Sequence, residues 1–230
     1  MSRTISPKKR HKPAKPVKPT EDAPRWRRRA EARPAEIVQA AYDVFAEKGF
    51  AAARLDDIAA RAGVSKGALY LYFETKQDIF EAVVRESLAP IFDAIEQFAF
   101  NFPGPFEQLI RLIVPRIAEV ADKSSLGRVI KMVVGESGNF PEVARIWHDD
   151  VIAKAIGLMT RIIERAQTRG EVREGDPRQH ALSIMSPMLV AVLFRETFVP
   201  VGAKPFDIPA LMQQHLDTVL SGLLKPSKRT

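Results

Sequence analysis

Residues 54–76 constrain the fold more than any other part of the chain, and they read RLDDIAARAGVSKGALYLYFETK. The i, i+3, i+4, i+7 spacing of a short helix with one apolar face is shared by Leu55, Ile58, Ala59 and Ala62. Gly63 follows, and a glycine at that position can take the positive φ that caps the last carbonyls of a helix. Ser65 is a good N-cap for a second helix. The short link forces the two helices to cross, which predicts a helix-turn-helix.

The second of these helices is expected to bury Leu69 and Phe73 and to present its other side chains outward. The outward set is Lys66, Gly67, Ala68, Tyr70, Leu71 and Tyr72. Such a helix enters the major groove of DNA by its N-terminal end, where side chains reach base edges and hydroxyl groups donate to phosphates. The alternative is an ordinary helical hairpin in which the two tyrosines are half-buried packing residues.

Two segments extend this pattern into a family resemblance. They are AEIVQAAYDVFAEKGF at residues 35–50 and LDDIAARAGVSKGALYLYF at residues 55–73, and Lys76 follows them. Together they resemble the N-terminal DNA-binding domain of the TetR family of bacterial transcriptional regulators. The resemblance implies an all-α fold, with a three-helix DNA-binding head and a helical ligand-binding and dimerisation body of about six helices. It also implies a homodimer that binds double-stranded DNA and whose operator affinity falls when a small molecule binds.

Carried over by position, the family's DNA-contacting places in the second helix of the motif fall on Lys66, Gly67, Tyr70, Leu71 and Tyr72. Lys76 is expected to hold a phosphate at the start of the next helix. Arg54 stands where the family usually has a Thr or Ser N-cap, which weakens the cap but supplies a cation near the DNA backbone. Ala68 stands where a Thr or Ser hydroxyl is common, so one possible polar contact is absent. Ser65 completes the set of candidate DNA-binding residues.

Composition limits the remaining possibilities. The chain has 230 residues, of which 46% are hydrophobic, enough for one large or two small domains with a real core. It contains no cysteine, which excludes disulfides, thiolate metal sites and cysteine nucleophiles. The longest strongly apolar run, residues 185–194, contains Pro187 and is too short to cross a bilayer. No secretory signal pattern follows the basic N-terminus, so we expect a cytoplasmic protein that does not enter a membrane.

The net charge of +7 is concentrated at the N-terminus. Residues 1–33 hold twelve Lys or Arg and three Asp or Glu, a net charge of +9, which leaves −2 for the rest of the chain. Residues 1–24 are rich in proline and lysine and are expected to be disordered. A candidate DNA arm follows, with the basic residues Arg25, Arg27, Arg28, Arg29 and Arg33. Flexible basic arms track phosphates or reach the minor groove. The alternative is a solvated tail that aids solubility.

Helix signals divide the chain into four parts. These are a basic tail and arm at residues 1–33, a DNA-binding domain at 34–80, a ligand-binding and dimerisation domain at 81–225 and a disordered tail at 226–230. Pro34 is expected at the first position of the first helix, which ends at Gly49. Thr75 and Asp78 form a capping box that opens a helix linking the head to the body. Breaks at residues 101–105, 121–125, 138–141, 170–177 and 199–209 predict five further helical segments.

The last two segments are candidates for a dimer interface, and Asp176 and Asp207 are the N-caps that open them. Apolar residues recur at helical spacing in both, at Leu182, Met185, Leu189 and Val192 or Leu193 in the first and at Met212, Leu216, Val219 and Leu223 in the second. Two adjacent amphipathic helices, in a chain whose near-palindromic operator requires a two-fold partner, suggest a four-helix interface between two copies. The alternative is that these side chains belong to the core of one chain.

The body is rich in large flexible or aromatic apolar side chains, which are typical of adaptable pockets. The candidate ligand-binding residues are Phe98, Met132, Trp147, Met185 and Met188, and the expected effector is a small hydrophobic molecule. At helical spacing the same residue types also make up an ordinary core.

The sequence contains no constellation of residues typical of an enzyme. Its four histidines are scattered, and His148, Asp149 and Asp150 would point to different faces of a helix, so neither a metal site nor a cofactor is expected. No phosphate-binding or dinucleotide motif occurs. We therefore expect a transcriptional regulator, with a repressor released by its ligand as the main interpretation. The alternatives are a ligand-independent architectural protein that binds DNA through its basic tail, and an enzyme built on helices.

Overall fold

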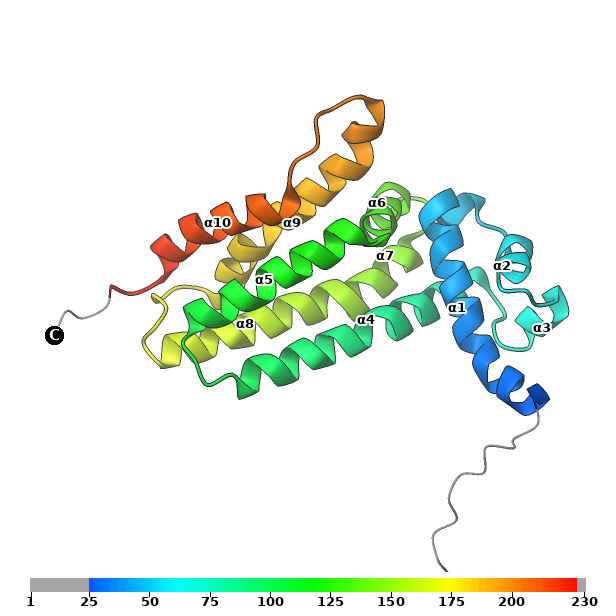
Figure 1. Ribbon diagram of the computed structural model, residues 1–230, viewed down its shortest axis with the longest axis horizontal. Helices are drawn as coiled ribbons and strands as arrows, with labels where there is room; N and C mark the ends of the chain where they lie inside the picture. Colours follow the sequence, from blue (N-terminus) through cyan, green and yellow to red (C-terminus); the bar gives the residue numbers. More distant parts are fainter. Residues whose placement is uncertain (1–24, 227–230) are drawn as a thin grey trace, which may run out of the picture. The chain divides into compact units, whose positions relative to one another are not determined.

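The computed structural model describes residues 25–226 as a series of helices joined by short loops (Figure 1). Side chains are described from Pro34 onward, apart from residues 87–90. The predictions for residues 1–24 and 227–230 fall outside the described residues. The helices are α1 (Arg25–Ala52), α2 (Leu55–Arg61), α3 (Lys66–Tyr70), α4 (Lys76–Asn101), α5 (Phe106–Lys123), α6 (Leu126–Glu136), α7 (Pro141–Trp147), the π turn η1 (His148–Ile152), α8 (Ala153–Thr168), α9 (Pro177–Phe198), the 3-10 turn η2 (Val199–Val201) and α10 (Ile208–Leu223). Within residues 25–226 the β-type pairing is limited to one isolated bridge, so the all-α prediction is confirmed.

Helix α1 begins earlier than the sequence predicts. Its backbone is helical from Arg25, so Pro34 lies inside the helix and not at its first position. A proline inside a helix removes one backbone hydrogen bond, but the residues before it are mainly Arg, Ala and Glu, which favour helix. The backbone of residues 25–33 is therefore helical, which differs from the predicted flexible arm. The compact unit that contains all the later helices starts at Pro34.

The end of α1 agrees with the prediction. Gly49 has a φ of 78° and a ψ of 170°, which interrupts the helical hydrogen bonding and leaves residues 50–52 as a separate turn. A positive φ of this size favours glycine because it has no Cβ to clash with the backbone.

The helices α1 to α3 and the start of α4 surround an aromatic core. Phe45, Phe50 and Phe80 are fully buried, and their ring centroids lie 5.5, 5.7 and 5.9 Å apart. Leu69 is buried in the same cluster and Phe73 is packed against it, as predicted. Aromatic pairs at these distances stabilise a core beyond the area that they bury.

This core continues into the body. Val129, Met132 and Val133 of α6 and Trp147 of α7 are buried in the same cluster as the side chains of α1 to α4. Helix α4 also runs unbroken across the predicted domain boundary at residue 80. We call this cluster the shared core, because the three head helices are packed on the body through it and are not separated from the body by a linker.

A second core lies among α5, α8, α9 and α10, whose neighbours in space are α5 with α10 and α8 with α9 (Figure 1). The five predicted breaks coincide with the loops between the helices that follow α4. The five segments are α5, α6, the pair α7 and α8, α9, and α10. Helices α7 and α8 form one continuous helical path, since the π turn η1 joins them without a loop.

The predicted N-caps are confirmed because each depends only on local sequence. Thr75 Oγ1 accepts a hydrogen bond from the N–H of Asp78 at 3.1 Å, and Asp78 Oδ2 accepts one from the N–H of Thr75 at 2.8 Å. Asp176 and Asp207 each accept a hydrogen bond from a backbone N–H in the first turn of α9 and α10, at 2.8 and 3.0 Å.

The apolar stripe of α10 faces inward, which differs from its predicted place in a dimer interface. Met212, Leu216 and Leu223 are buried in the second core of their own chain, where α10 packs on α5 and α9. Helical periodicity identifies the apolar face of a helix but does not identify what covers that face. For α10, the alternative of an intramolecular core is the correct one.

Helix α9 has apolar side chains on both its buried and its exposed sides. Val192 is buried in the second core and Met185 is packed against it. The exposed apolar side chains are Leu182, Leu189, Val190 and Phe198. By length and composition alone, Pro177–Val201 is the one helical span within the described residues that could cross a bilayer. Of its most apolar stretch, 17% is buried in the protein. Helix α9 packs on α6, α8 and α10, so it is an integral helix of the body. Its exposed side is an apolar patch on the surface of that body.

Candidate nucleic-acid interface

The turn between α2 and α3 has the predicted construction. Gly63 has a φ of 66°, in the left-handed region. Ser65 Oγ accepts a hydrogen bond from the N–H of Ala68 at 3.2 Å and so caps α3. At the start of α2, the N–H of Arg54 donates to Asp57 Oδ2 at 3.3 Å. Arg54 has no side-chain oxygen to accept a first-turn N–H, and the N–H of Asp57 donates to the backbone carbonyl of Arg54 at 3.0 Å instead.

Helix α3 and the residues after it expose one side to solvent. Leu69 is fully buried, whereas the exposed fractions of Tyr70, Leu71 and Tyr72 are 46%, 82% and 40%. Lys66 and Gly67 are exposed as well, and Ala68 is half-buried. We define the α3 face as Lys66, Gly67, Tyr70, Leu71 and Tyr72. The predicted division into inward Leu69 and Phe73 and an outward set is therefore present, with Phe73 half-buried and with Ala68 half-buried where it was predicted to face outward.

Lys66 has an ion-pair partner that the sequence analysis does not identify. Its Nζ lies 2.8 Å from Asp56 Oδ1, and both side chains are more than half exposed. The hydrogen bond to Asp56 and the charge of that carboxylate hold the pKa of Lys66 above its ordinary value. The acid is visible in the first turn of α2, but the ten-residue separation across the turn conceals the pairing.

Lys76 has partners that differ from its expected phosphate contact. Its Nζ donates to the backbone carbonyls of Ala51 and Ala53, at 3.2 and 3.1 Å, and to that of Phe50. The ammonium also lies 4.5 Å from the centroid of the Phe50 ring, a cation–π distance. Burial lowers the pKa of Lys76, and the negative charge of Glu136 acts in the opposite direction. In this structure Lys76 holds together the turn that follows Gly49 at the C-terminal end of α1.

Glu136, the last residue of α6, makes a contact beside this interface that the sequence analysis does not predict. Its carboxylate accepts hydrogen bonds from the N–H groups of Phe50 and Ala51, at 3.1 and 2.7 Å. No local pattern could have revealed it, because 85 residues separate Glu136 from the turn that it contacts.

Two further ion pairs fix α2 on α1. Arg61 donates to both carboxylate oxygens of Glu47 at 2.7 Å, a bidentate geometry, and Lys48 Nζ lies 3.0 Å from Asp57 Oδ1. The hydrogen bond from Arg61 is the main cause that lowers the pKa of Glu47, and that from Lys48 is the main cause that lowers the pKa of Asp57. Both carboxylates are thereby kept ionised over a wide pH range.

The arm residues predicted to contact DNA are Arg25, Arg27, Arg28, Arg29 and Arg33. The structure describes their backbone as the first part of α1, and their DNA contact stays a prediction.

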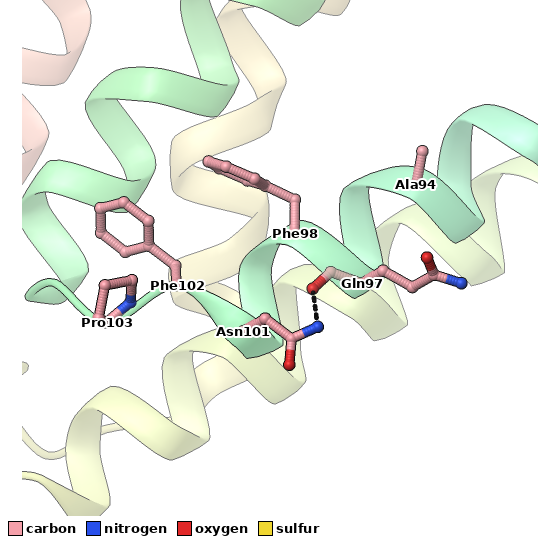
Figure 2. Close-up of a pocket in the computed structure, with 6 residues that line it drawn as sticks. All are labelled: Ala94, Gln97, Phe98, Asn101, Phe102 and Pro103. Carbon is pink, nitrogen blue, oxygen red and sulfur yellow. Dashed lines mark hydrogen bonds between the residues drawn. The ribbon is translucent and has the colours of Figure 1, made fainter.

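The structure does not bring the five candidate ligand-binding residues into one site. Phe98 lines a surface hollow of about 420 Å³ at the C-terminal end of α4, together with Ala94, Gln97, Asn101, Phe102 and Pro103 (Figure 2). Met132 and Trp147 are buried in the shared core. Met185 and Met188 are packed against the second core.

The rings of Phe98 and Phe102 both project toward the hollow, with their centroids 5.7 Å apart (Figure 2). The amide Nδ2 of Asn101 donates to the backbone carbonyl of Gln97 at 2.8 Å, which fixes one polar side of the rim. An apolar hollow with a few polar groups at its rim is typical of small-molecule sites.

These features define a class of protein. An exposed helix-turn-helix is packed on a helical body. Among residues 34–226, apart from 87–90, no group of three His, Asp or Glu side chains could hold a metal ion. His148 Nδ1 pairs with its neighbour Asp149 at 2.7 Å and with no third ligand. The chain has the architecture of a helix-turn-helix DNA-binding protein.

Comparison with known proteins identifies the family. Residues 37–83 match the family model for bacterial regulatory proteins of the tetR family, and residues 104–204 match the tetracyclin repressor-like C-terminal domain. The chain is 30% identical over 211 residues to the HTH-type transcriptional repressor BepR of Brucella suis, covering 87% of this chain and 98% of that protein. It is 25% identical over 189 residues to the fatty acid metabolism regulator protein of Bacillus subtilis, covering 82% and 94%. The chain belongs to the TetR family of DNA-binding transcriptional regulators, which are not enzymes.

Solved structures share the fold. The SmeT–triclosan complex, whose protein is a repressor from Stenotrophomonas maltophilia, superposes with a TM-score of 0.72 at 23% identity, covering 85% of this chain and 93% of that one. FadR from Bacillus subtilis in complex with stearoyl-CoA has a TM-score of 0.68 at 22% identity, covering 82% and 98%. At these identities the similarity establishes the fold.

We expect Asp56→Asn to tighten DNA binding by about two- to fivefold at low salt, because it frees Lys66 and removes a negative charge from the DNA-facing side. Fluorescence anisotropy with a duplex taken from beside the gene of this protein measures the effect. Glu74→Gln is the control, since Glu74 is exposed in the same region and has no ion-pair partner among the described residues. Equal effects of the two substitutions would mean that only net charge matters.

Proposed function

We propose that this protein is a homodimeric repressor that binds a near-palindromic operator through two copies of α3 and is released by a small hydrophobic effector. The observation that carries the proposal is the α3 face, where five residues are exposed beside the fully buried Leu69. Two recognition helices on a two-fold axis would read successive major grooves about 34 to 36 Å apart.

The chemistry of the α3 face supports a division of labour among its side chains. Lys66 carries a charge at the first position of α3, where it can reach a phosphate or a base acceptor. The hydroxyls of Tyr70 and Tyr72 can donate to phosphates. The 82% exposed Leu71 suits an apolar contact such as a thymine methyl group. A Cβ built at Gly67 meets nothing within 4 Å, so the DNA backbone can approach closely there.

We place the dimer interface on the exposed side of α9. Leu182, Leu189 and Val190 are exposed there, and an apolar patch of this kind on a helical body is typical of a protein–protein contact. The outward face of α10 is more polar, and its residues Gln214, Thr218 and Ser221 would flank the contact. An interface between copies also accounts for the membrane-like composition of α9, so no membrane partner is required, and we assign the protein to the cytoplasm.

The hollow at the end of α4 is the proposed entry for the effector. Its Phe98 and Phe102 rings offer two apolar surfaces, which favour a flat or chain-like hydrophobic molecule. The ligands in the structures of two fold relatives share an apolar part, since triclosan is a chlorinated aromatic molecule and stearoyl-CoA carries a long acyl chain on a polar CoA group. An effector that prefers one position of α4 would shift the dimer toward a spacing that cannot bridge both half-sites.

DNA contact by the α3 face is tested by footprinting on the promoter region beside the gene. Lys66→Ala is expected to weaken protection and to reduce the salt slope of binding by about one, because one phosphate or base contact is lost. Tyr70→Phe should weaken binding by about 1 kcal/mol, through loss of a single hydrogen bond.

Lys204→Ala, an exposed lysine beyond α9, is the control and should leave the footprint unchanged. An unaltered footprint in both α3 variants would refute the contact assignment. Deletion of residues 1–33 should weaken binding and keep the footprint, whereas an architectural protein that binds through its tail would lose binding altogether.

The interface is tested by sedimentation velocity of Leu189→Asp. The substitution places a charge in an apolar contact and should weaken dimerisation by about tenfold or more. Leu112→Asp on α5 is the matched control, since Leu112 and Leu189 are 48% and 42% exposed. Dissociation by the α5 variant, with the α9 variant still dimeric, would place the interface elsewhere.

Leu216→Ala on α10 should act on stability and not on dimerisation. Leu216 is buried in the second core, so its truncation should lower the free energy of unfolding, measured by denaturant titration, by about 2–5 kcal/mol.

Effector binding is tested by thermal shift with stearoyl-CoA and triclosan as probes. A ligand at about 100 times its Kd adds about 2.7 kcal/mol to the stability of the folded protein. Phe98→Ala should reduce the shift, and Phe206→Ala should not, because Phe206 has similar exposure and does not line the hollow. Equal shifts in both variants would exclude the hollow as the entry.

A further inference from the structure

The turn at the C-terminal end of α1, from Gly49 to Ala53, is held from two sides by charged groups of other helices. Glu136, at the end of α6, accepts the N–H groups of Phe50 and Ala51. Lys76, at the start of α4, donates to the carbonyls of Phe50, Ala51 and Ala53. The same short turn thus presents its donors to an anion and its acceptors to a cation. We call residues 49–53 with these two side chains the latch.

The latch depends on close packing as well as on charge. A Cβ built at Gly49 would lie 2.5 Å from Glu136 Oε1, so a side chain at this position would displace the carboxylate. The Phe140 ring packs on Phe50 with centroids 5.1 Å apart, and Lys76 Nζ lies 4.5 Å from the centroid of the Phe50 ring. Charge-assisted hydrogen bonds in such a partly buried place are stronger than those between neutral groups.

Helix α6 connects the latch to α9. Near its N-terminal end, a Cβ at Gly127 would lie 2.6 Å from an Arg195 side-chain nitrogen, so the two helices are in close contact there. Lys131 Nζ donates to the backbone carbonyl of Glu196 at 2.6 Å. Arg195 in turn bonds the side chain and the carbonyl of Asp122, both at 2.9 Å. One helix of eleven residues therefore contacts α9 near one end and the turn before α2 at the other.

We propose that Glu136 and Lys76 are positioning residues, which fix the helix-turn-helix relative to α6 and so make operator affinity depend on the position of α6. This inference rests on the proposed function and deepens it, because it names the two side chains that hold the turn leading into α2. A shift of α6 that carried the Glu136 carboxylate out of hydrogen-bond range would release the N–H groups of Phe50 and Ala51. The turn that leads into α2 would then lose one of its two anchors.

The first test measures an intrachain distance and requires neither operator nor effector. The natural chain has no cysteine, so Ala60→Cys on α2 and Glu164→Cys on α8 can be spin-labelled selectively. Labelled protein diluted into unlabelled protein reports the distance within one chain. We expect Glu136→Gln, which keeps the side-chain shape, to broaden or shift the distance distribution.

Glu142→Gln is the matched control, because Glu142 also joins a body helix to α4, through a 3.3 Å hydrogen bond from Gln77. It should leave the distribution unchanged. A distribution for Glu136→Gln identical to that of the natural protein would overturn the proposal, whether or not the protein binds the tested DNA.

The second test distinguishes positioning from simple stabilisation. Loss of the Glu136 charge should lower the pKa of Lys76 further, measured by NMR of the lysine side chain, while a denaturation midpoint near that of the natural protein shows that the fold is kept. Operator Kd should rise by about three- to thirtyfold in Glu136→Gln. An unchanged Kd together with an altered distance would show that the latch positions the head without controlling DNA binding, which contradicts the second half of the proposal. Absence of DNA binding by the natural protein would instead refute the proposed function.

Discussion

The shared core is the constraint on which the rest of this structure depends. Phe50 and Phe80 are completely buried among side chains of the three DNA-binding helices, and Met132 and Trp147 of α6 and α7 belong to the same cluster. Because protein interiors are close-packed, a displacement of α6 or α7 cannot be absorbed by empty space and has to be transmitted to the neighbouring helices. The head is therefore mechanically part of the body, although it carries a separate function.

Polar contacts add direction to this apolar packing. The shared core fixes how closely the helices approach, but it is compatible with small rotations, since apolar contacts are not directional. Glu136 and Lys76 bind opposite groups of one turn and therefore specify its orientation. The bidentate pair between Arg61 and Glu47 does the same for α2 on α1. Together these contacts fix the turn that leads into α2 and the position of α2 on α1.

The sequence predicts those features that depend on near neighbours along the chain. The helix-turn-helix follows from Gly63 and Ser65, and the starts of α4, α9 and α10 follow from their capping residues, because each cap is completed within three residues. The partners of Glu136 and Lys66 could not be predicted, since they are brought together only by the tertiary fold. The periodicity of α10 correctly predicts which of its side chains form an apolar face. Only the structure shows that α5 and α9 pack against that face. Pro34 was misplaced because local helix formers outweighed one missing hydrogen bond.

The ion pair between Lys66 and Asp56 has a consequence for the search along the chromosome. In the DNA complex proposed above, a duplex would first have to draw the Lys66 ammonium away from its carboxylate, 2.8 Å distant, before that cation could contact the nucleic acid. Random sequence offers only phosphates in return, whereas a matched site adds contacts to base edges. The cost of breaking the pair is the same on both, so in the proposed complex Asp56 would lower the affinity for random and for matched duplex alike. Shorter residence on random sequence would speed the search, while discrimination would stay with the contacts to base edges.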